Sequence, residues 1–333
     1  MRVLVAGGAG YIGSQVTLEL CREGHTPVIF DSLIKGHRGA ANAALGRQGR
    51  FIQGDLNDLE LVKRVLIQEK IEAVIHLAAF SLVGESVLHP DKYFRNNLGN
   101  GQNLLDAMAT SGVKLLVFSS TAAVYGEPRQ TPIAEEHPLN PANPYGFTKM
   151  AFEGMMRAYD QAYGLRFISL RYFNAAGADP EAGMGEDHRP ESHLIPIVLQ
   201  TALGLRPHLE LYGADYPTPD GTCIRDYIHI LDLAQAHLLA LKALAAGGAS
   251  QIYNLGNGQG YSNRQVIAAA EAVTGRKIPV KESPRRPGDP AILVASSERI
   301  KTELGWKPKY PQLESIIESA WRWHLNHPQG YED

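Results

Sequence analysis

The stretch that most constrains the fold is a cluster of glycines close to the N-terminus. The apolar run RVLVA (residues 2–6) predicts a short buried strand, and GGAGYIG (residues 7–13) follows it directly. The next residues, up to Gly24, have the apolar spacing of a helix, and PVIFD then predicts a second strand that ends at Asp31. The sequence therefore predicts a strand, a glycine turn, a helix and a second strand.

Two glycine patterns overlap in this turn. Gly8, Gly10 and Gly13 fit G-x-G-x-x-G. With Gly7 in place of Gly8, the same residues fit the variant G-x-x-G-x-x-G. Missing side chains let the backbone approach a pyrophosphate, whose charge the start of the helix stabilises. Glycines are common in turns, so the prediction of dinucleotide binding depends on the strand and helix that flank the pattern.

The acidic residue at the end of the second strand indicates which dinucleotide is bound. Asp31 lies about 20 residues beyond the glycine turn, where a carboxylate hydrogen-bonds the adenosine ribose hydroxyls. A carboxylate there repels a ribose phosphate, which favours NAD over NADP. Lys35 and Arg38 follow closely and have the opposite charge, so they count against this preference. NAD is the predicted cofactor.

Strand and helix patterns continue to alternate along the first half of the chain, as far as the strand in KLLVFSSTAAVYG. This alternation predicts an α/β fold with a doubly wound parallel Rossmann sheet, whose ligand lies at the carboxyl ends of the strands. We expect a smaller, interleaved α/β substrate-binding lobe beside it. The predicted domains are residues 1–174 for NAD, with segments of about 225–257 returning to them, and residues 175–224 and 258–333 for a nucleotide sugar.

A tyrosine and a lysine in NPYGFTKM (residues 143–150) are candidates for proton transfer. Tyr145 and Lys149 lie four residues apart on a predicted helix, so they share a face. A tyrosine that acts as a base near neutrality needs its pKa lowered by about 3 units, or roughly 4 kcal/mol. A lysine ammonium and a cationic nicotinamide can supply this, and Ser119, Ser120 or Thr121 can orient the substrate oxygen.

Several motifs in the same order along the chain resemble those of the extended short-chain dehydrogenase/reductase family. They are GGAGYIG, HLAAFSLVGES, FSSTAAVYGEP and NPYGFTKM, and the later LRYFNAAGA, SHLIPIVLQTALG, IYNLGNGQGYSN and RRPGD resemble the UDP-glucose 4-epimerase family within it. The resemblance implies that Tyr145 removes the proton of the sugar 4-hydroxyl while hydride passes to tightly held NAD. Lys149 then holds the nicotinamide ribose, Thr121 is the third catalytic hydroxyl, and the 4-keto sugar turns over before the hydride returns.

The resemblance also implies two sets of binding residues. The cofactor set is Gly7, Gly10, Tyr11, Ile12, Gly13, Asp31, Asp55, Leu56, Leu77, Ala78, Ala79, Asn96, Ser119, Tyr145, Lys149 and Phe173. The substrate set is Thr121, Tyr145, Asn174, His193, Leu194, Tyr212, Arg225, Arg286, Asp289 and Leu293. Ser81 stands where some relatives have a lysine that contacts the cofactor. Leu293 stands where a bulky tyrosine narrows the sugar pocket, so we also expect UDP-N-acetylglucosamine and UDP-N-acetylgalactosamine as substrates.

Other functions remain open at this point. A nucleotide-sugar 4,6-dehydratase shares the fold, the cofactor and Tyr-x-x-x-Lys, but it has an Asp-Glu pair where this chain has Ala122 and Ala123, which cannot shuttle protons. A different NAD-dependent nucleotide-sugar epimerase is also possible, as is a non-catalytic NAD-sensing protein with the same fold.

Composition narrows the partners and the location. The net charge is -3, with 32 basic residues interspersed among 35 acidic ones, which is not typical of a nucleic-acid or membrane-binding surface. We expect a cytoplasmic enzyme that binds a UDP-sugar, and the family resemblance implies a homodimer. The run GEDHRPESH (residues 185–193) has no strong metal-binding spacing and the implied mechanism requires no metal, so none is expected.

Overall fold

The computed structural model describes residues 1–286 and 288–332, and a seven-stranded parallel sheet forms its larger lobe. All neighbouring strands in this sheet run parallel. Their order across the sheet is β3 (Arg50–Gln53), β2 (Thr26–Asp31), β1 (Arg2–Ala6), β4 (Ala73–His76), β5 (Leu115–Thr121), β6 (Arg166–Tyr172) and β10 (Gln251–Leu255). The order reverses at β1, as in a doubly wound sheet, and the predicted fold class is confirmed.

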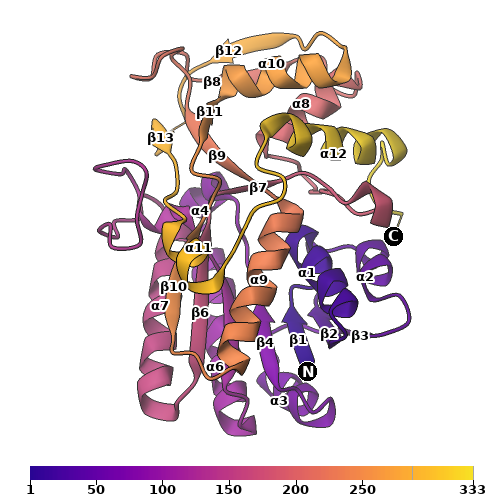
Figure 1. The fold of residues 1–333 in the computed structure, drawn as a ribbon, viewed down its shortest axis with the longest axis vertical. Helices are drawn as coiled ribbons and strands as arrows, with labels where there is room; N and C mark the ends of the chain where they lie inside the picture. The colour runs from indigo at the N-terminus through magenta and orange to yellow at the C-terminus, as the bar shows by residue number, and fades with distance from the viewer. Residues whose placement is uncertain (287, 333) are drawn as a thin grey trace.

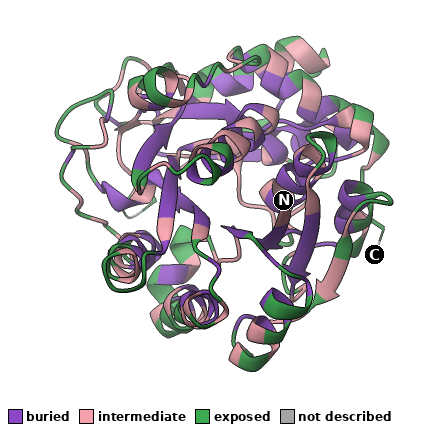
Figure 2. Cartoon of the chain, turned by 60° about the horizontal axis from the view of Figure 1, so that its bottom comes forward, coloured by how far each residue is buried: buried purple, intermediate pink, exposed green. Residues whose placement is uncertain are grey.

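The strands are apolar on both faces because helices cover both faces of the sheet (Figure 1). In β1, Leu4 and Ala6 face one helical layer, and Val3 and Val5 face the other. The first layer contains α3 (Leu59–Gln68), α6 (Asn100–Ser111) and α7 (Pro144–Tyr163). The second contains α1 (Tyr11–Arg22) and α9 (Ile230–Ala245). Figure 2 shows this arrangement as buried strands enclosed by helices that are exposed on their outer sides.

A smaller lobe lies above the carboxyl ends of the strands in the view of Figure 1. Its central strand is β9 (Ile224–His229), which pairs with β7 (Asn174–Ala176), β11 (Gly260–Ser262) and β13 (Ile292–Leu293). A second, two-stranded sheet pairs β8 (Leu209–Tyr212) with β12 (Val280–Ser283). The helices α8 (Leu194–Ala202), α10 (Asn263–Thr274) and α12 (Leu313–Asn326) form the apolar core of this lobe.

The two lobes interleave along the chain. After β9 in the smaller sheet, α9 packs on the larger sheet and β10 becomes its edge strand, before the chain returns to the smaller lobe. The segment of about residues 225–257 was predicted to return to the NAD domain. Its first residues, which form β9, instead lie in the smaller lobe. The domain boundaries themselves stay a prediction.

The remaining helical segments are short. They are α2 (Arg38–Leu45), α4 (Val83–Leu88), α5 (Pro90–Tyr93), a π-helical turn (Phe94–Gly99), two 3₁₀ turns (Ala122–Val124 and Pro180–Ala182) and α11 (Glu298–Leu304). Within the described residues, the helices lack the length and apolar character needed to cross a membrane.

Candidate active site

A cleft lies at the carboxyl ends of the parallel strands, facing the smaller lobe. Residues at or just beyond the ends of five neighbouring strands line it: Gly7 after β1, Asp31 in β2, Asp55 after β3, Leu77 after β4 and Thr121 in β5. The cavity has a volume of about 460 Å³, within the range of small-molecule sites. Both lobes contribute residues to its walls, so one cleft can hold a ligand that contacts each lobe.

The glycine turn forms one wall of this cleft at the start of α1. Gly7 has a φ of +86°, a left-handed conformation that favours glycine. A Cβ on Gly13 would collide with the Gly7 carbonyl, so both residues are required by the turn itself. A Cβ on Gly10 would come no closer than 3.5 Å to the Gly7 oxygen. Gly10 thus leaves open space in front of the helix N-terminus, which fits the pyrophosphate of a dinucleotide.

Asp31 ties the glycine turn to the end of β2. Its Oδ2 accepts a hydrogen bond from the Ala9 amide at 3.0 Å, and its Oδ1 accepts one from the Leu33 amide at 2.8 Å. Burial raises the pKa of this carboxyl, and the two amide hydrogen bonds oppose the rise. The carboxylate lies against the cleft, where a ribose can reach it.

The two cations that follow Asp31 have partners within the protein. The Lys35 Nζ donates to the Arg189 carbonyl at 3.1 Å. The Arg38 guanidinium lies 3.8 Å from the centre of the Phe51 ring and donates to Gln53. These contacts weaken the sequence argument for NADP, because neither cation is free to bind a ribose phosphate without losing them.

The Tyr145 and Lys149 side chains reach the cleft from the first two turns of α7. Asn143 caps this helix by accepting a hydrogen bond from the Gly146 amide at 2.9 Å, and Pro144 occupies its first turn. A Cβ on Gly146 would collide with the Ala123 carbonyl. The glycine therefore lets the start of α7 approach the turn that follows β5, which brings Tyr145 beside Thr121.

Thr121 lies close enough to Tyr145 for its hydroxyl to affect the tyrosine pKa. Its Oγ1 accepts from the Ala123 amide at 3.2 Å, which leaves the hydroxyl proton available. Burial raises the pKa of Tyr145, and the hydrogen bond with Thr121 lowers it in part. Thr121, rather than Ser119 or Ser120, is thus the hydroxyl that contacts the tyrosine.

Lys149 lies beneath Tyr145, inside the protein. Its Nζ donates to the Ser119 carbonyl at 2.7 Å and lies 6.0 Å from the centre of the Tyr145 ring. Burial lowers the pKa of Lys149 to about 7, although the Glu153 carboxylate opposes this. From the sequence, Lys149 was predicted to lower the pKa of Tyr145. In the structure the ammonium is turned toward Ser119, and burial is the largest influence on the pKa of Tyr145, which it raises.

A buried ion pair supports this part of α7 from below. Glu153 binds the Arg171 guanidinium through Oε1 at 3.0 Å and Oε2 at 2.5 Å, and both side chains are about 2% exposed. Ser120 and Ser169 donate to the same carboxylate at 2.7 and 2.9 Å. All these partners are on β5 and β6, so the network fixes α7 and its two functional side chains against the sheet.

The structure brings nearly all of the predicted cofactor residues to the cleft. Of that set, Ser119 alone does not line it. Its side chain is fully buried and its Oγ is 2.8 Å from Nε2 of His237 on the opposite helical layer. Ser81 does line the cleft.

Apart from Thr121 and Tyr145, the predicted substrate residues all come from the smaller lobe and its connections, and five of them line the cleft. Besides Thr121 and Tyr145, the cleft is lined by Asn174, His193, Arg225, Asp289 and Leu293. Arg225 and Asp289 form an ion pair at 3.8 Å. Leu194, Tyr212 and Arg286 do not line the cleft. Instead, the Arg286 guanidinium lies 4.0 Å from the centre of the Tyr212 ring, so these two residues form one stacked pair.

Sequence reasoning missed other residues of the cleft wall. Glu186 and His188 line it, and His188 packs edge-on against Tyr11 of the glycine turn. Phe80 and Glu85 line it from the region after β4. The run that contains Glu186 and His188 was visible as a charged segment, but its position against the glycine turn depends on contacts between distant parts of the chain.

Comparison with known proteins places this cleft in a family. The model of the NAD dependent epimerase/dehydratase family matches residues 3–256. A protein of Lacticaseibacillus casei described as a UDP-glucose 4-epimerase is 52% identical over 333 residues, covering 100% of this chain and 99% of that protein.

Two solved structures superpose over nearly the whole chain. A crystal structure of a UDP-glucose 4-epimerase has a TM-score of 0.95 at 50% identity and covers 100% of both chains. The UDP-glucose 4-epimerase of Bifidobacterium longum, solved in complex with NAD⁺ and UDP, has a TM-score of 0.94 at 37% identity and covers 99% of this chain and 100% of that one.

Proposed function

Because this chain belongs to the NAD dependent epimerase/dehydratase family, we propose that it is an isomerase of the UDP-glucose 4-epimerase type, which interconverts UDP-galactose and UDP-glucose with bound NAD. The observation that carries the proposal is the position of Tyr145, hydrogen-bonded to Thr121, in the same cleft as the glycine turn. A proton acceptor and a dinucleotide site thus meet in one space.

The residues present fit NAD along the length of the cleft. Gly10 would admit the pyrophosphate at the N-terminus of α1, Asp31 would bind the adenosine ribose, and Lys149 would hold the nicotinamide ribose. Bound NAD would supply a hydride acceptor and donor for C4 of the sugar and a cationic ring that favours a nearby phenolate.

The side chains of the protein would move the proton of the sugar 4-hydroxyl. Tyr145 takes this proton as general base and returns it when the other epimer forms. Thr121 donates a hydrogen bond that stabilises the phenolate, since its own acceptor site is already used by the Ala123 amide. Lys149, whose Nζ donates to the Ser119 carbonyl, would hold a ribose hydroxyl of the cofactor.

A dehydratase would need an additional acid and base in this cleft to expel water. Ala122 and Ala123 line the cleft directly after Thr121, and their methyl groups cannot transfer protons. A non-catalytic NAD-binding protein would have no need for the Thr121, Tyr145 and Lys149 constellation. Both alternatives are therefore less well supported than epimerisation.

The nucleotide end of the substrate would bind the smaller lobe. The guanidinium of Arg225 is suited to a diphosphate, and Asp289, which now pairs with it at 3.8 Å, can hydrogen-bond a ribose. Asn174, at the start of β7, lines the same cleft. Leu293 lines the cleft, and the family resemblance places it where a larger tyrosine narrows the sugar pocket of some relatives, so the N-acetyl UDP-sugars are proposed as further substrates.

We also propose that the enzyme is a homodimer that uses the exposed apolar face beside α7. Val87, Leu88, Phe94 and Phe147 are exposed there, and the two phenylalanine rings pack edge-on with their centres 6.0 Å apart. The cytoplasmic location stays a prediction.

The test is to incubate the purified protein with UDP-galactose, without added NAD, and to separate the products by chromatography. We expect UDP-glucose from the wild type and none from Tyr145→Phe, whereas Tyr163→Phe, at the exposed end of the same helix, keeps full activity. Failure of the wild type to convert UDP-galactose, also with NAD supplied, would refute the function. Full turnover by Tyr145→Phe would refute the proposed base alone.

A further inference from the structure

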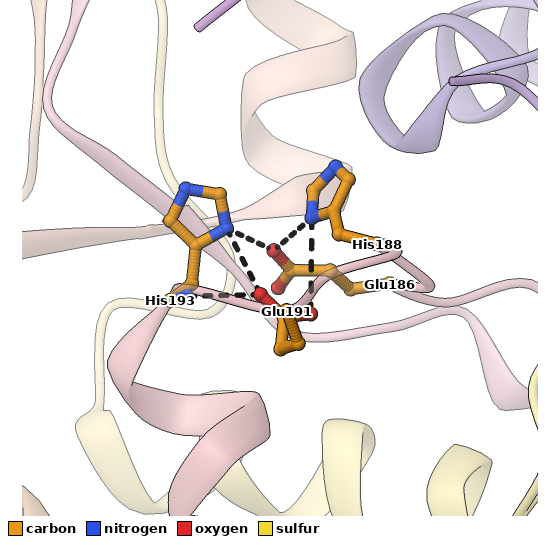
Figure 3. A group of neighbouring side chains, drawn as sticks. All are labelled: Glu186, His188, Glu191 and His193. Carbon is orange, nitrogen blue, oxygen red and sulfur yellow. Dashed lines mark hydrogen bonds and ion pairs between the residues drawn. The ribbon is translucent and has the colours of Figure 1, made fainter. Parts of the chain in front are cut away.

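Four metal-binding side chains converge on one point in the loop before α8 (Figure 3). They are Glu186, His188, Glu191 and His193, which come from eight consecutive residues. One ligand atom from each lies within 4.8 Å of the others. Nδ1 of His193 is 2.6 Å from Glu186 Oε1, and Nδ1 of His188 is 3.1 Å from the same oxygen.

Two atoms of this quartet lack hydrogen bonds among the described residues, although they are buried. One is Nδ1 of His188, which lies near Glu186 Oε1 but not in hydrogen-bonding geometry. The other is Oε2 of Glu191, whose side chain is only 3% exposed and whose nearest cation is His188 at 3.8 Å. Buried polar atoms are normally paired, so two such atoms that face each other indicate a missing common partner.

The other oxygen of Glu191 shows why its carboxylate points inward. Oε1 accepts hydrogen bonds from the amides of Ser192 and His193 at 2.7 and 2.9 Å. These bonds fix the carboxylate in place, so that its unpaired Oε2 faces Nδ1 of His188. Glu186 is also buried, at 4% exposed.

We propose that Glu186, His188, Glu191 and His193 bind one divalent zinc ion in tetrahedral coordination. Zinc takes imidazole nitrogens and carboxylate oxygens at about 2.0–2.2 Å, which sets neighbouring ligand atoms of a tetrahedron roughly 3.3–3.6 Å apart. Nδ1 of His188 lies 3.1 Å from Glu186 Oε1 and 3.8 Å from Glu191 Oε2, and Nδ1 of His193 lies 2.6 Å from Glu186 Oε1, so these separations fall on both sides of that value. Two carboxylates balance the charge of the ion.

The site is structural, because its four ligands leave no position open for a reacting group. It fixes the loop that forms one side of the cleft, where His188 packs on Tyr11. The neighbouring Asp187 accepts a hydrogen bond from the Tyr331 amide at 3.0 Å and lies 3.5 Å from His37, so the same loop also joins the C-terminus to the region after β2. The proposal replaces the expectation, drawn from sequence spacing, that the chain binds no metal.

The test measures the zinc content of the full-length protein, purified without a histidine tag and dialysed, by mass spectrometry. The variants are His188→Gln and Glu191→Gln. His208→Gln is the matched control, since His208 also lies close to a glutamate, at 4.0 Å, but outside the quartet. Bound NAD and circular dichroism report whether each variant is folded.

We expect about one zinc per chain in the wild type and in His208→Gln, and a loss of affinity of more than about 100-fold in the other two variants. Two results would overturn the proposal. In one, the wild-type protein contains no zinc and, after treatment with a chelator, shows no saturable binding of one Zn²⁺. In the other, both ligand variants are folded and contain as much zinc as the wild type. If the variants fail to fold, the absorption spectrum of wild-type protein loaded with Co²⁺ is the deciding measurement. A spectrum typical of tetrahedral Co²⁺ supports the site, and one typical of octahedral Co²⁺ refutes it. None of these readouts depends on epimerase activity.

Discussion

Replacing Thr121 by valine removes one hydrogen bond from Tyr145 and conserves the shape of the side chain. The Thr121 hydroxyl donates to the tyrosine oxygen, and the bond lowers a pKa that burial has raised. Losing the bond disfavours the phenolate, so the pKa of Tyr145 must rise further. The acidic limb of the pH profile of kcat should therefore move to higher pH.

The size of this effect follows from the charge on the phenolate. A hydrogen bond to a charged group is worth about 1.5–3 kcal/mol. At 1.36 kcal/mol per pKa unit, this raises the tyrosine pKa by about 1–2 units. On the acidic limb, where the fraction of phenolate limits the rate, kcat should fall by roughly 10-fold to 100-fold. The Ala123 amide also loses its acceptor, which costs about 1 kcal/mol of stability.

The assay is kcat for UDP-galactose across the pH range in which the protein stays folded, with bound NAD measured in each sample. Thr121→Ser keeps the hydroxyl and should retain the wild-type pH profile. A Thr121→Val enzyme with lower kcat but an unshifted acidic limb would show that the threonine only positions the substrate. Wild-type kcat at every pH would refute the role of the hydrogen bond altogether.

Three further predictions concern the support of the site, the cofactor and the sugar. Glu153→Gln or Arg171→Met leaves a buried charge unpaired and should lower the free energy of unfolding in urea by about 3–5 kcal/mol; a loss below 1 kcal/mol would contradict the buried pair. Gly10→Ala should fold with nearly wild-type stability but lose bound NAD, as measured by absorbance after denaturation, whereas Gly13→Ala should be strongly destabilised; equal NAD content in Gly10→Ala and wild type would be inconsistent with a pyrophosphate at this position. Leu293→Tyr should lower kcat/KM for UDP-N-acetylglucosamine by at least about 10-fold while that for UDP-galactose changes little; parallel losses for both sugars would count against a selective effect on the acetamido group.

The sequence predicted the parts of the fold that depend on local patterns. The buried runs of β1 and β2, the glycine turn and the acid at Asp31 are all within one short segment, where periodicity and turn chemistry decide the structure. Thr121 was predicted as a catalytic hydroxyl, first as one of three candidates to orient the substrate oxygen and then from the family resemblance. Its contact with Tyr145 was not predicted. It depends on the close approach of α7 to β5 at Gly146, which no local pattern reveals.

The predictions that the structure does not support all concern side-chain direction or long-range contacts. The family resemblance placed Ser119 at the cofactor, but its side chain faces His237 on the other side of the sheet. Arg286 and Tyr212 stack on each other rather than line the cleft. The Lys149 ammonium points toward the Ser119 carbonyl, and burial raises the pKa of Tyr145. Both features likewise result from tertiary packing.

The central claim is that C4 of the sugar gives up its hydrogen within the protein and receives the same hydrogen back. The most direct measurement uses UDP-galactose with deuterium at C4, incubated with the protein in ordinary water and without added NAD. The account predicts UDP-glucose that retains the deuterium at C4. UDP-glucose with hydrogen from water at C4, or the absence of any UDP-glucose, would contradict it.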